Sequence, residues 1–236
     1  MLLDVALNPA EIALLPQRDL SATTCVVFDI LRATSSMITA LHHGATEIHP
    51  VRTIEEALAL KARMPHAVLG GERHGDLIPG FELGNAPQEY TAVSGRTIIT
   101  TTTNGTLALR ACEGARRVLV GALLNLDALA GELLDEEPEH LLLVCAGTFA
   151  DFALEDAYAA GALITLLDQP RLTDAAQAAL AVAHRFSAPL HALNAAKNGV
   201  VLTAKGRGGD VEWCAQRSVF NVLGQMQSAV IRPLVK

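Results

Sequence analysis

Short apolar runs rich in β-branched residues recur along this chain, and each is followed by small polar residues and then by a helical pattern. The clearest runs are residues 25–28, 97–100, 118–120 and 141–145. The helical patterns fall at residues 35–43, 54–63, 106–112, 127–134, 154–167 and 174–186. Apolar runs of this kind predict strands buried on both faces of a parallel sheet, with the helices as crossovers. We therefore expect an α/β fold built in layers.

A faint internal repeat accompanies this alternation. Residues 43–48, His-Gly-Ala-Thr-Glu-Ile, line up with residues 113–118, Glu-Gly-Ala-Arg-Arg-Val, at an offset of 70 positions. In both places a helix is expected to end at Gly-Ala and a second strand to follow. Glycine is also the usual C-terminal cap of a helix, so chance similarity is the alternative to duplication.

Two glycine-rich stretches interrupt the pattern. Residues 70–87 are predicted to form the longest irregular stretch, and long ordered loops of compact enzymes often carry function. Residues 198–210 are predicted to form a hairpin or an active-site flap. Lys205 in this second stretch is a candidate anion contact, and Asp210 is a further acid.

Charge and cysteine content restrict the partners and the compartment. The net charge is −7, which argues against nucleic acid or an acidic membrane as a partner. Cys25, Cys112, Cys145 and Cys214 show no C-x-x-C spacing and are interpreted as buried thiols of a reducing compartment. The N-terminus lacks a signal-peptide pattern, and no apolar run is long enough for a membrane span. We expect a soluble, cytoplasmic protein.

The first candidate for chemistry follows the apolar run 25–28. Asp29 stands where that strand ends, Arg32 comes next, and Thr34 and Ser35 open a helix. Open α/β sheets bind ligands at the carboxyl ends of their strands, and N–H groups, hydroxyls and a guanidinium suit a phosphate or sulfonate. Asp29 could ligate Mg²⁺ or attack phosphorus. The alternative, equally supported by the local pattern, is that Asp29 and Thr34 only cap the helix.

Two further turns carry polar residues. Thr103, Asn104, Gly105 and Thr106 stand at another strand-to-helix turn, where hydroxyls and N–H groups could bind an anion. The same residues could be only a strand end and an Asn-Gly turn. In the segment 70–73, Gly-Gly-Glu-Arg, the glycines would let the backbone approach a ligand, and the Glu and Arg would add a carboxylate and an anion fork. A surface salt bridge is the alternative there.

A fourth candidate follows the apolar run 141–145. Glu155 and Asp156 are adjacent acids at the start of a helix and could bind Mg²⁺, although acids there also suit the helix dipole. Cys145 ends the strand and could be a nucleophile, although a cysteine at such a position is more often a core thiol.

Taken in order, these stretches resemble the 2-phosphosulfolactate phosphatase (ComB) family. The matching blocks are residues 27–35, residues 70–73 followed by 80–87, residues 102–106 with 124–125, and residues 145–147 followed by 154–156 and 160–161. Each block alone is unspecific, but four blocks in order with compatible spacing are a strong signal. The match runs from about residue 26 to residue 161, with a weaker echo at Gly199, Gly206 and Asp210.

The resemblance implies Mg²⁺-dependent hydrolysis of (R)-2-phospho-3-sulfolactate to 3-sulfolactate and phosphate, a step of coenzyme M biosynthesis. It also implies a three-layer α/β/α architecture with mostly parallel sheets. Two related lobes, about residues 1–120 and 121–236 of a single unit of residues 1–236, are expected to hold the site between them. Glu82 and Ala86 stand where the family is expected to have Asp and Ser, which leaves room for a related small phosphorylated acid as substrate.

On this basis Asp29, Glu72 and Arg32 are expected to act in catalysis, with water or Asp29 as the nucleophile. Mg²⁺ is expected on some subset of four carboxylates, namely Asp29, Glu72, Glu155 and Asp156. The residues expected to bind the anionic substrate are Arg32, Thr34, Ser35, Arg73, Thr103, Asn104, Gly105 and Thr106.

Two other functions stay open at this point: a Cys145-dependent C–N or ester hydrolase, and a non-catalytic binder of small sulfonates or phosphates. A homodimer is left open as well.

Overall fold

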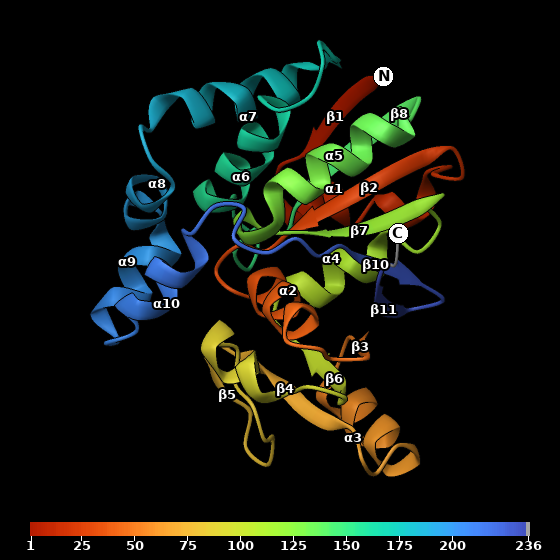
Figure 1. Ribbon diagram of the computed structural model, residues 1–236, viewed down its shortest axis with the longest axis vertical. Helices are drawn as coiled ribbons and strands as arrows, with labels where there is room; N and C mark the ends of the chain where they lie inside the picture. The colour runs from red at the N-terminus through yellow and green to blue at the C-terminus, as the bar shows by residue number, and fades with distance from the viewer. Residues whose placement is uncertain (235–236) are drawn as a thin grey trace.

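The computed structural model describes residues 1–234 of the chain, and strands and helices alternate as the sequence predicts over most of the part before α7 (Figure 1). The strands are β1 (Leu2–Ala6), β2 (Thr23–Phe28), β3 (Glu47–Pro50), β4 (Val68–Arg73), β5 (Asp76–Leu77), β6 (Thr97–Thr101), β7 (Arg117–Gly121), β8 (His140–Cys145), β9 (Arg171–Leu172), β10 (Gly224–Gln227) and β11 (Val230–Pro233). The helices are α1 (Pro9–Ile12), α2 (Ala33–His42), α3 (Ile54–Arg63), α4 (Gly105–Ala111), α5 (Leu126–Glu136), α6 (Leu154–Ile164), α7 (Asp174–Arg185), α8 (Pro189–Ala195), α9 (Lys197–Ala204) and α10 (Gly208–Cys214). Three short 3₁₀ turns lie at Leu15–Gln17, Pro87–Ala92 and Leu123–Asn125.

The described strands form one sheet in the order β5-β4-β6-β3-β11-β10-β7-β2-β8-β1-β9. Strands β4, β6 and β3 are mutually parallel, and so are β7, β2, β8, β1 and β9. The hairpin of β10 and β11 joins these two blocks by antiparallel pairing on both of its sides. The blocks therefore run in opposite directions, and in Figure 1 they occupy the lower and upper parts of the molecule.

The faint sequence repeat corresponds to a repeat of structure. The series β2-α2-β3-α3-β4 has the same element order as β6-α4-β7-α5-β8. Equivalent strands occupy equivalent positions on the two sides of the β10–β11 hairpin. β3 and β7 are next to it, β6 and β2 come second, and β4 and β8 come third. Strands of the two series are interleaved, because β2 lies between β7 and β8. A lobe boundary near residue 120 stays a prediction, since the continuous sheet does not delimit it.

Helices cover both faces of the sheet, which confirms the three-layer α/β/α expectation. Residues of β2 alternate between two buried clusters, as successive side chains of a strand must. Val26 and Phe28 belong to the cluster that contains α5, α6 and α7, whereas Cys25 and Val27 belong to the cluster that contains α2 and α4. A smaller cluster packs α3 against β4 and β6.

The first glycine-rich stretch differs from the prediction in part, and the second differs entirely. Residues 78–86 are irregular as expected, but residues 70–73 belong to the buried strand β4, where the two glycines allow neighbouring parts of the protein to pack closely. A Cβ on Gly71, whose φ is +133°, would lie 2.0 Å from the Thr101 carbonyl oxygen, and a Cβ on Gly70 would lie 2.4 Å from the Tyr90 hydroxyl. The stretch 198–210 is neither a hairpin nor an irregular flap, since it forms most of α9 and the start of α10.

None of the helices within residues 1–234 combines the length and the apolar character that crossing a bilayer requires.

The contact between α6 and α7 yields a test with a matched control. Gly161 in α6 faces α7 so closely that a Cβ would lie 2.0 Å from the Ala179 carbonyl oxygen, whereas a Cβ on Gly131 in α5 meets nothing within 4 Å. Gly131→Ala is expected to raise the free energy of unfolding by about 0.5–1 kcal/mol, because alanine favours the helix. Gly161→Ala is expected to lower it by about 2 kcal/mol, because the overpacking outweighs that gain. Urea unfolding followed by circular dichroism measures both changes, and a gain in both variants would contradict the packing described here.

Candidate active site

A pocket of about 160 Å³ opens between the carboxyl end of β2, strand β4 with its hairpin turn, the β6–α4 turn, the segment after β8, and helix α9. Asp29, Arg32, Glu72, Thr103 and Asn104 all line it. The structure therefore brings together residues from three separate motifs of the sequence. The predicted site residues Thr34, Ser35, Arg73, Gly105, Thr106, Glu155 and Asp156 do not line it.

Asp29 is the buried carboxylate at the end of β2, with an exposed fraction of 9%. Its Oδ1 accepts a hydrogen bond from the backbone N–H of Ala33 at 3.2 Å. A Cβ on Gly105 would lie 2.5 Å from Asp29 Oδ2, so the glycine at the start of α4 makes room for this carboxylate. Burial, together with the negative charges of Glu72 and Glu155, raises the pKa of Asp29 to about 7.

The hydroxyls that follow Asp29 serve the turn itself. The hydroxyl of Thr34 accepts from the Asp29 N–H and donates to the Asp29 carbonyl, both at 3.0 Å. The Ser35 hydroxyl donates to the Ile30 carbonyl oxygen at 2.8 Å. Both side chains are fully buried, so they fix the direction in which Asp29 and Arg32 point and have no free surface for a ligand.

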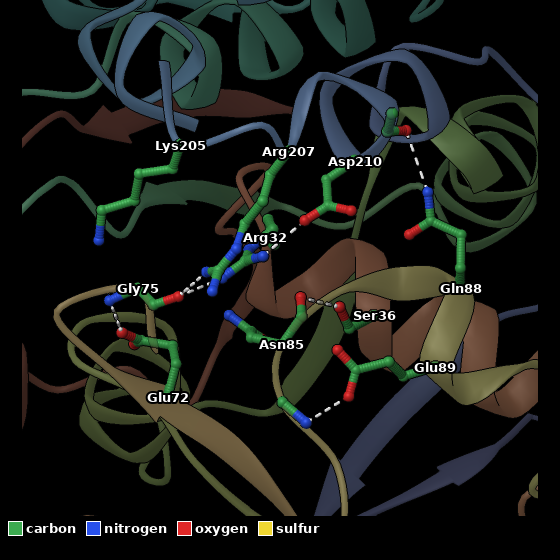
Figure 2. A network of polar contacts seen from close by, with 12 residues as sticks. Arg32, Ser36, Glu72, Gly75, Asn85, Gln88, Glu89, Lys205, Arg207 and Asp210 are labelled. Atoms are coloured by element: carbon green, nitrogen blue, oxygen red, sulfur yellow. Dashed lines mark hydrogen bonds and ion pairs between the residues drawn. The ribbon is translucent and has the colours of Figure 1, made fainter. Parts of the chain in front are cut away.

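Arg32 is held by groups that are distant in the sequence (Figure 2). Its Nη1 forms an ion pair with Asp210 of α10 at 2.5 Å, and its Nη2 donates to the Gly75 carbonyl oxygen at 2.8 Å. Arg207 donates to the same carbonyl oxygen. The Arg32 side chain is 3% exposed, so its charge is matched inside the protein by Asp210. Arg32 therefore joins the β2–α2 turn to the β4–β5 turn and to α10.

Glu72 connects β4 to the β6–α4 turn. Its carboxylate accepts from the backbone N–H groups of Thr103 and Gly75, each at 2.7 Å, and from the Thr103 hydroxyl at 3.2 Å. The neighbouring Arg73 points elsewhere, because its guanidinium donates to the Glu72 carbonyl oxygen at 2.7 Å and to the Thr101 hydroxyl at 2.8 Å.

The residues after Thr103 also engage the protein. Asn104 donates to the carbonyl oxygens of Ala146 and Phe149 and accepts from the Phe149 N–H, which fixes the segment after β8 against the β6–α4 turn. The hydroxyl of Thr106 donates to the Thr102 carbonyl oxygen and accepts from the Thr102 N–H. Thr106 thus closes its turn as Thr34 does in the equivalent position of the first series.

The adjacent acids at the start of α6 lie behind the pocket. Asp156 accepts from the N–H groups of Ile30 at 2.8 Å and Gly147 at 3.1 Å, so it ties the end of β2 to the end of β8. Glu155 accepts from Asn198 Nδ2 at 2.6 Å. Burial raises the pKa of both carboxyls, and in Asp156 the charges of Glu155 and Asp29 raise it further.

No group of three or more His, Cys, Asp or Glu side chains within residues 1–234 is arranged to hold a metal ion. The four candidate carboxylates therefore do not form one cage. Asp29 and Glu72 do share the pocket, and Mg²⁺ is commonly held by one or two carboxylates together with water and substrate phosphate. These two carboxylates are therefore the candidates to hold such an ion.

Sequence reasoning missed several residues that line the pocket. His74 and Asn85 come from the β4–β5 turn and the segment after it, and Lys197 and Asn198 come from the start of α9. Asn85 lies within the second family block and could have been singled out there. The start of α9 was hidden, because its glycine suggested a break where the chain is helical.

The Arg32–Asp210 pair yields a test of how the pocket is held. Asp210→Asn is expected to lower the free energy of unfolding by about 3–5 kcal/mol, because it leaves a buried guanidinium without its anion. Asp76→Asn is the control, since its pairs with Lys205 and Arg207 are exposed and should contribute far less. Guanidinium chloride unfolding gives both values, and equally small losses would show that Asp210 does not hold Arg32.

Comparison with known proteins agrees with the geometry. The model of the 2-phosphosulpholactate phosphatase family matches residues 11–229. A protein of Deinococcus radiodurans named probable 2-phosphosulfolactate phosphatase is 40% identical over 204 residues, which cover 84% of this chain and 85% of that protein. Proteins of the same name from Carboxydothermus hydrogenoformans and Thermotoga maritima are 40% and 36% identical. These alignments cover 84% and 93% of this chain, and 84% and 96% of the relatives.

Proposed function

This chain belongs to the 2-phosphosulfolactate phosphatase family, and we propose that it hydrolyses (R)-2-phospho-3-sulfolactate to 3-sulfolactate and phosphate. The observation that carries the proposal is the convergence of Asp29 and Glu72 in one pocket, from strands β2 and β4 of the two oppositely directed blocks. A related small phosphorylated acid is the nearest alternative substrate. Hydrolysis of phosphosulfolactate would place the protein in coenzyme M biosynthesis.

The crowding of carboxylates supports a cation in the site. Without one, burial raises the pKa of Asp29 to about 7, and the negative charges of Glu72 and Glu155 add to that rise. A phosphate dianion would meet the same repulsion. We therefore propose Mg²⁺ on Asp29 and Glu72, where it would neutralise the phosphoryl oxygens and polarise phosphorus.

The remaining groups position the substrate. Backbone N–H groups of Thr103 and Gly75 already orient Glu72, and Thr34 with Ala33 orients Asp29, so neither carboxylate has to reorganise when the substrate enters. Glu155 and Asp156 act on the pocket through Asn198 and through the ends of β2 and β8. We assign them a supporting role.

The cysteines support a reducing compartment. All four are free and buried. Unpaired thiols are typical of proteins that stay in the cytosol, and we propose that this enzyme works there.

Substitution of the two carboxylates tests the proposed site. Asp29→Asn and Glu72→Gln are each expected to lower kcat for phosphate release from phosphosulfolactate by at least about 100-fold, since each removes a group at the reacting centre. Glu139→Gln is the control, because Glu139 is 85% exposed and precedes the start of β8, the opposite end from the pocket. A chelator should abolish wild-type activity and added Mg²⁺ should restore it.

Full activity in both carboxylate variants, with circular dichroism showing that both are folded, would contradict the proposal. Trapping a phosphoenzyme by acid quench would reject direct attack by water, and its absence would count against Asp29 as the nucleophile.

The structure disfavours the alternative in which Cys145 is a nucleophile. Its side chain is fully buried, and burial, with the charge of Asp156 as a smaller cause, raises the pKa of its thiol well above the usual value. Cys145→Ala is expected to keep kcat for phosphate release within about twofold, at a stability cost on the order of 1 kcal/mol for the lost packing. Loss of all turnover in a folded Cys145→Ala protein, with turnover in the wild type unaffected by chelator, would instead support the cysteine hydrolase.

A further inference from the structure

Helix α9 forms the wall of the pocket that faces the carboxylates. The residues it contributes recur at the helical spacing of four, so they share one face. They are Lys197, Asn198, Val201, Leu202 and Lys205, the last being the residue that caps the helix. The face therefore carries a lysine at each end and aliphatic side chains between them.

The positively charged residues of the pocket differ in whether they already have a buried anionic partner. Among the described residues that line it, Arg32, Lys197 and Lys205 carry a positive charge at neutral pH. Arg32 already has a buried anion, because Asp210 lies 2.5 Å from it. The two lysines of α9 have no buried anionic partner among their ion pairs, so they can respond to the charge of a ligand.

The present partners of the lysines are exchangeable. Lys205 lies 3.2 Å from Asp76, with the two side chains 41% and 60% exposed, and Asp76 has a second partner in Arg207 at 3.1 Å. Lys197 lies 3.1 Å from Asp151, and both side chains are more than half exposed. Exposed ion pairs of this kind contribute little, so a ligand that replaces Asp76 at Lys205 loses little stabilisation. In Figure 2 the Lys205 side chain lies on the same side of the polar network as Glu72 and Gly75.

We infer that Lys205, assisted by Lys197, binds the sulfonate of the substrate. Lys205 is thereby a determinant of substrate specificity. The inference rests on the proposed function, because the phosphate must lie at Asp29 and Glu72 for hydrolysis. The sulfonate is one bond further from the phosphate oxygen than the carboxylate is, so it is the acidic group that extends furthest from the reacting centre. Val201 and Leu202 line the pocket between the two lysines and offer apolar contact to the carbon chain of the substrate.

Two substrates that differ only in the sulfonate test this inference. For Lys205→Gln, KM for phosphosulfolactate is expected to rise about tenfold or more, the usual effect of losing a hydrogen bond to a charged group. The kcat is expected to change by less than about twofold, because Lys205 contacts no reacting atom. KM for phospholactate, which lacks the sulfonate, is expected to stay within about twofold. Lys197→Gln should show the same pattern with a smaller rise.

The controls separate binding from structure. Lys205→Arg keeps the charge and should restore most of the affinity for phosphosulfolactate. Lys61→Gln removes a lysine of α3, outside the pocket, and should change neither KM. Equal rises in KM for both substrates in Lys205→Gln, or no rise for either, would overturn the inference.

A failure of the proposed function would look different. If the wild type releases phosphate from neither compound, binding of 3-sulfolactate still tests the lysine through the melting temperature. The inference expects 3-sulfolactate, and not lactate, to raise the melting temperature of the wild type but not that of Lys205→Gln. Absence of that stabilisation in the wild type, or its persistence in Lys205→Gln, would reject the assignment.

Discussion

The buried charge of Arg32 is the constraint on which the pocket depends. A charged side chain that is 3% exposed must have an anion inside the protein, and Asp210 of α10, which lies 178 residues further along the chain, provides it. The same side chain bonds the Gly75 carbonyl oxygen, which brings the β4–β5 turn to the end of β2. Three segments that are far apart in the sequence are thereby fixed around one cavity. The position of α9, which precedes α10, follows from this arrangement, and with it the lysine-bearing wall.

The pocket is chemically divided as a result. At its inner end the pKa of Asp29 is raised by burial and further by the charges of Glu72 and Glu155, whereas its α9 wall presents lysines whose present ion pairs are exposed. A substrate with a phosphate at one end and a sulfonate at the other matches that division once a cation offsets the charge at the inner end. This explains how a chain with a net charge of −7 can accommodate a strongly anionic molecule.

The sequence predicts the strand ends well, because apolar runs followed by polar turns depend on local pattern. Asp29, Arg32, Glu72, Thr103 and Asn104 were expected at the site, and they share one pocket. The hydroxyls of Thr34 and Thr106 were expected to contact substrate, but they bond the backbone of their own turns, and the residue type alone does not distinguish the two uses. Gly71 suggested a loop, whereas its positive φ and its approach to Thr101 belong to a buried strand. The role of Asp210 depends on its ion pair with Arg32, which is 178 residues away in the sequence, and a local sequence pattern does not reveal such a contact.

We propose that phosphate is released in the cavity between Asp29, Glu72 and α9. The most direct test is a crystal structure of the protein with Mg²⁺, 3-sulfolactate and vanadate, an analogue of the transferred phosphoryl group. We expect vanadate beside Asp29 and Glu72, and the sulfonate within hydrogen-bonding distance of Lys205. Vanadate and sulfolactate bound elsewhere on the surface, with the Asp29 and Glu72 carboxylates free of ligand, would contradict this account.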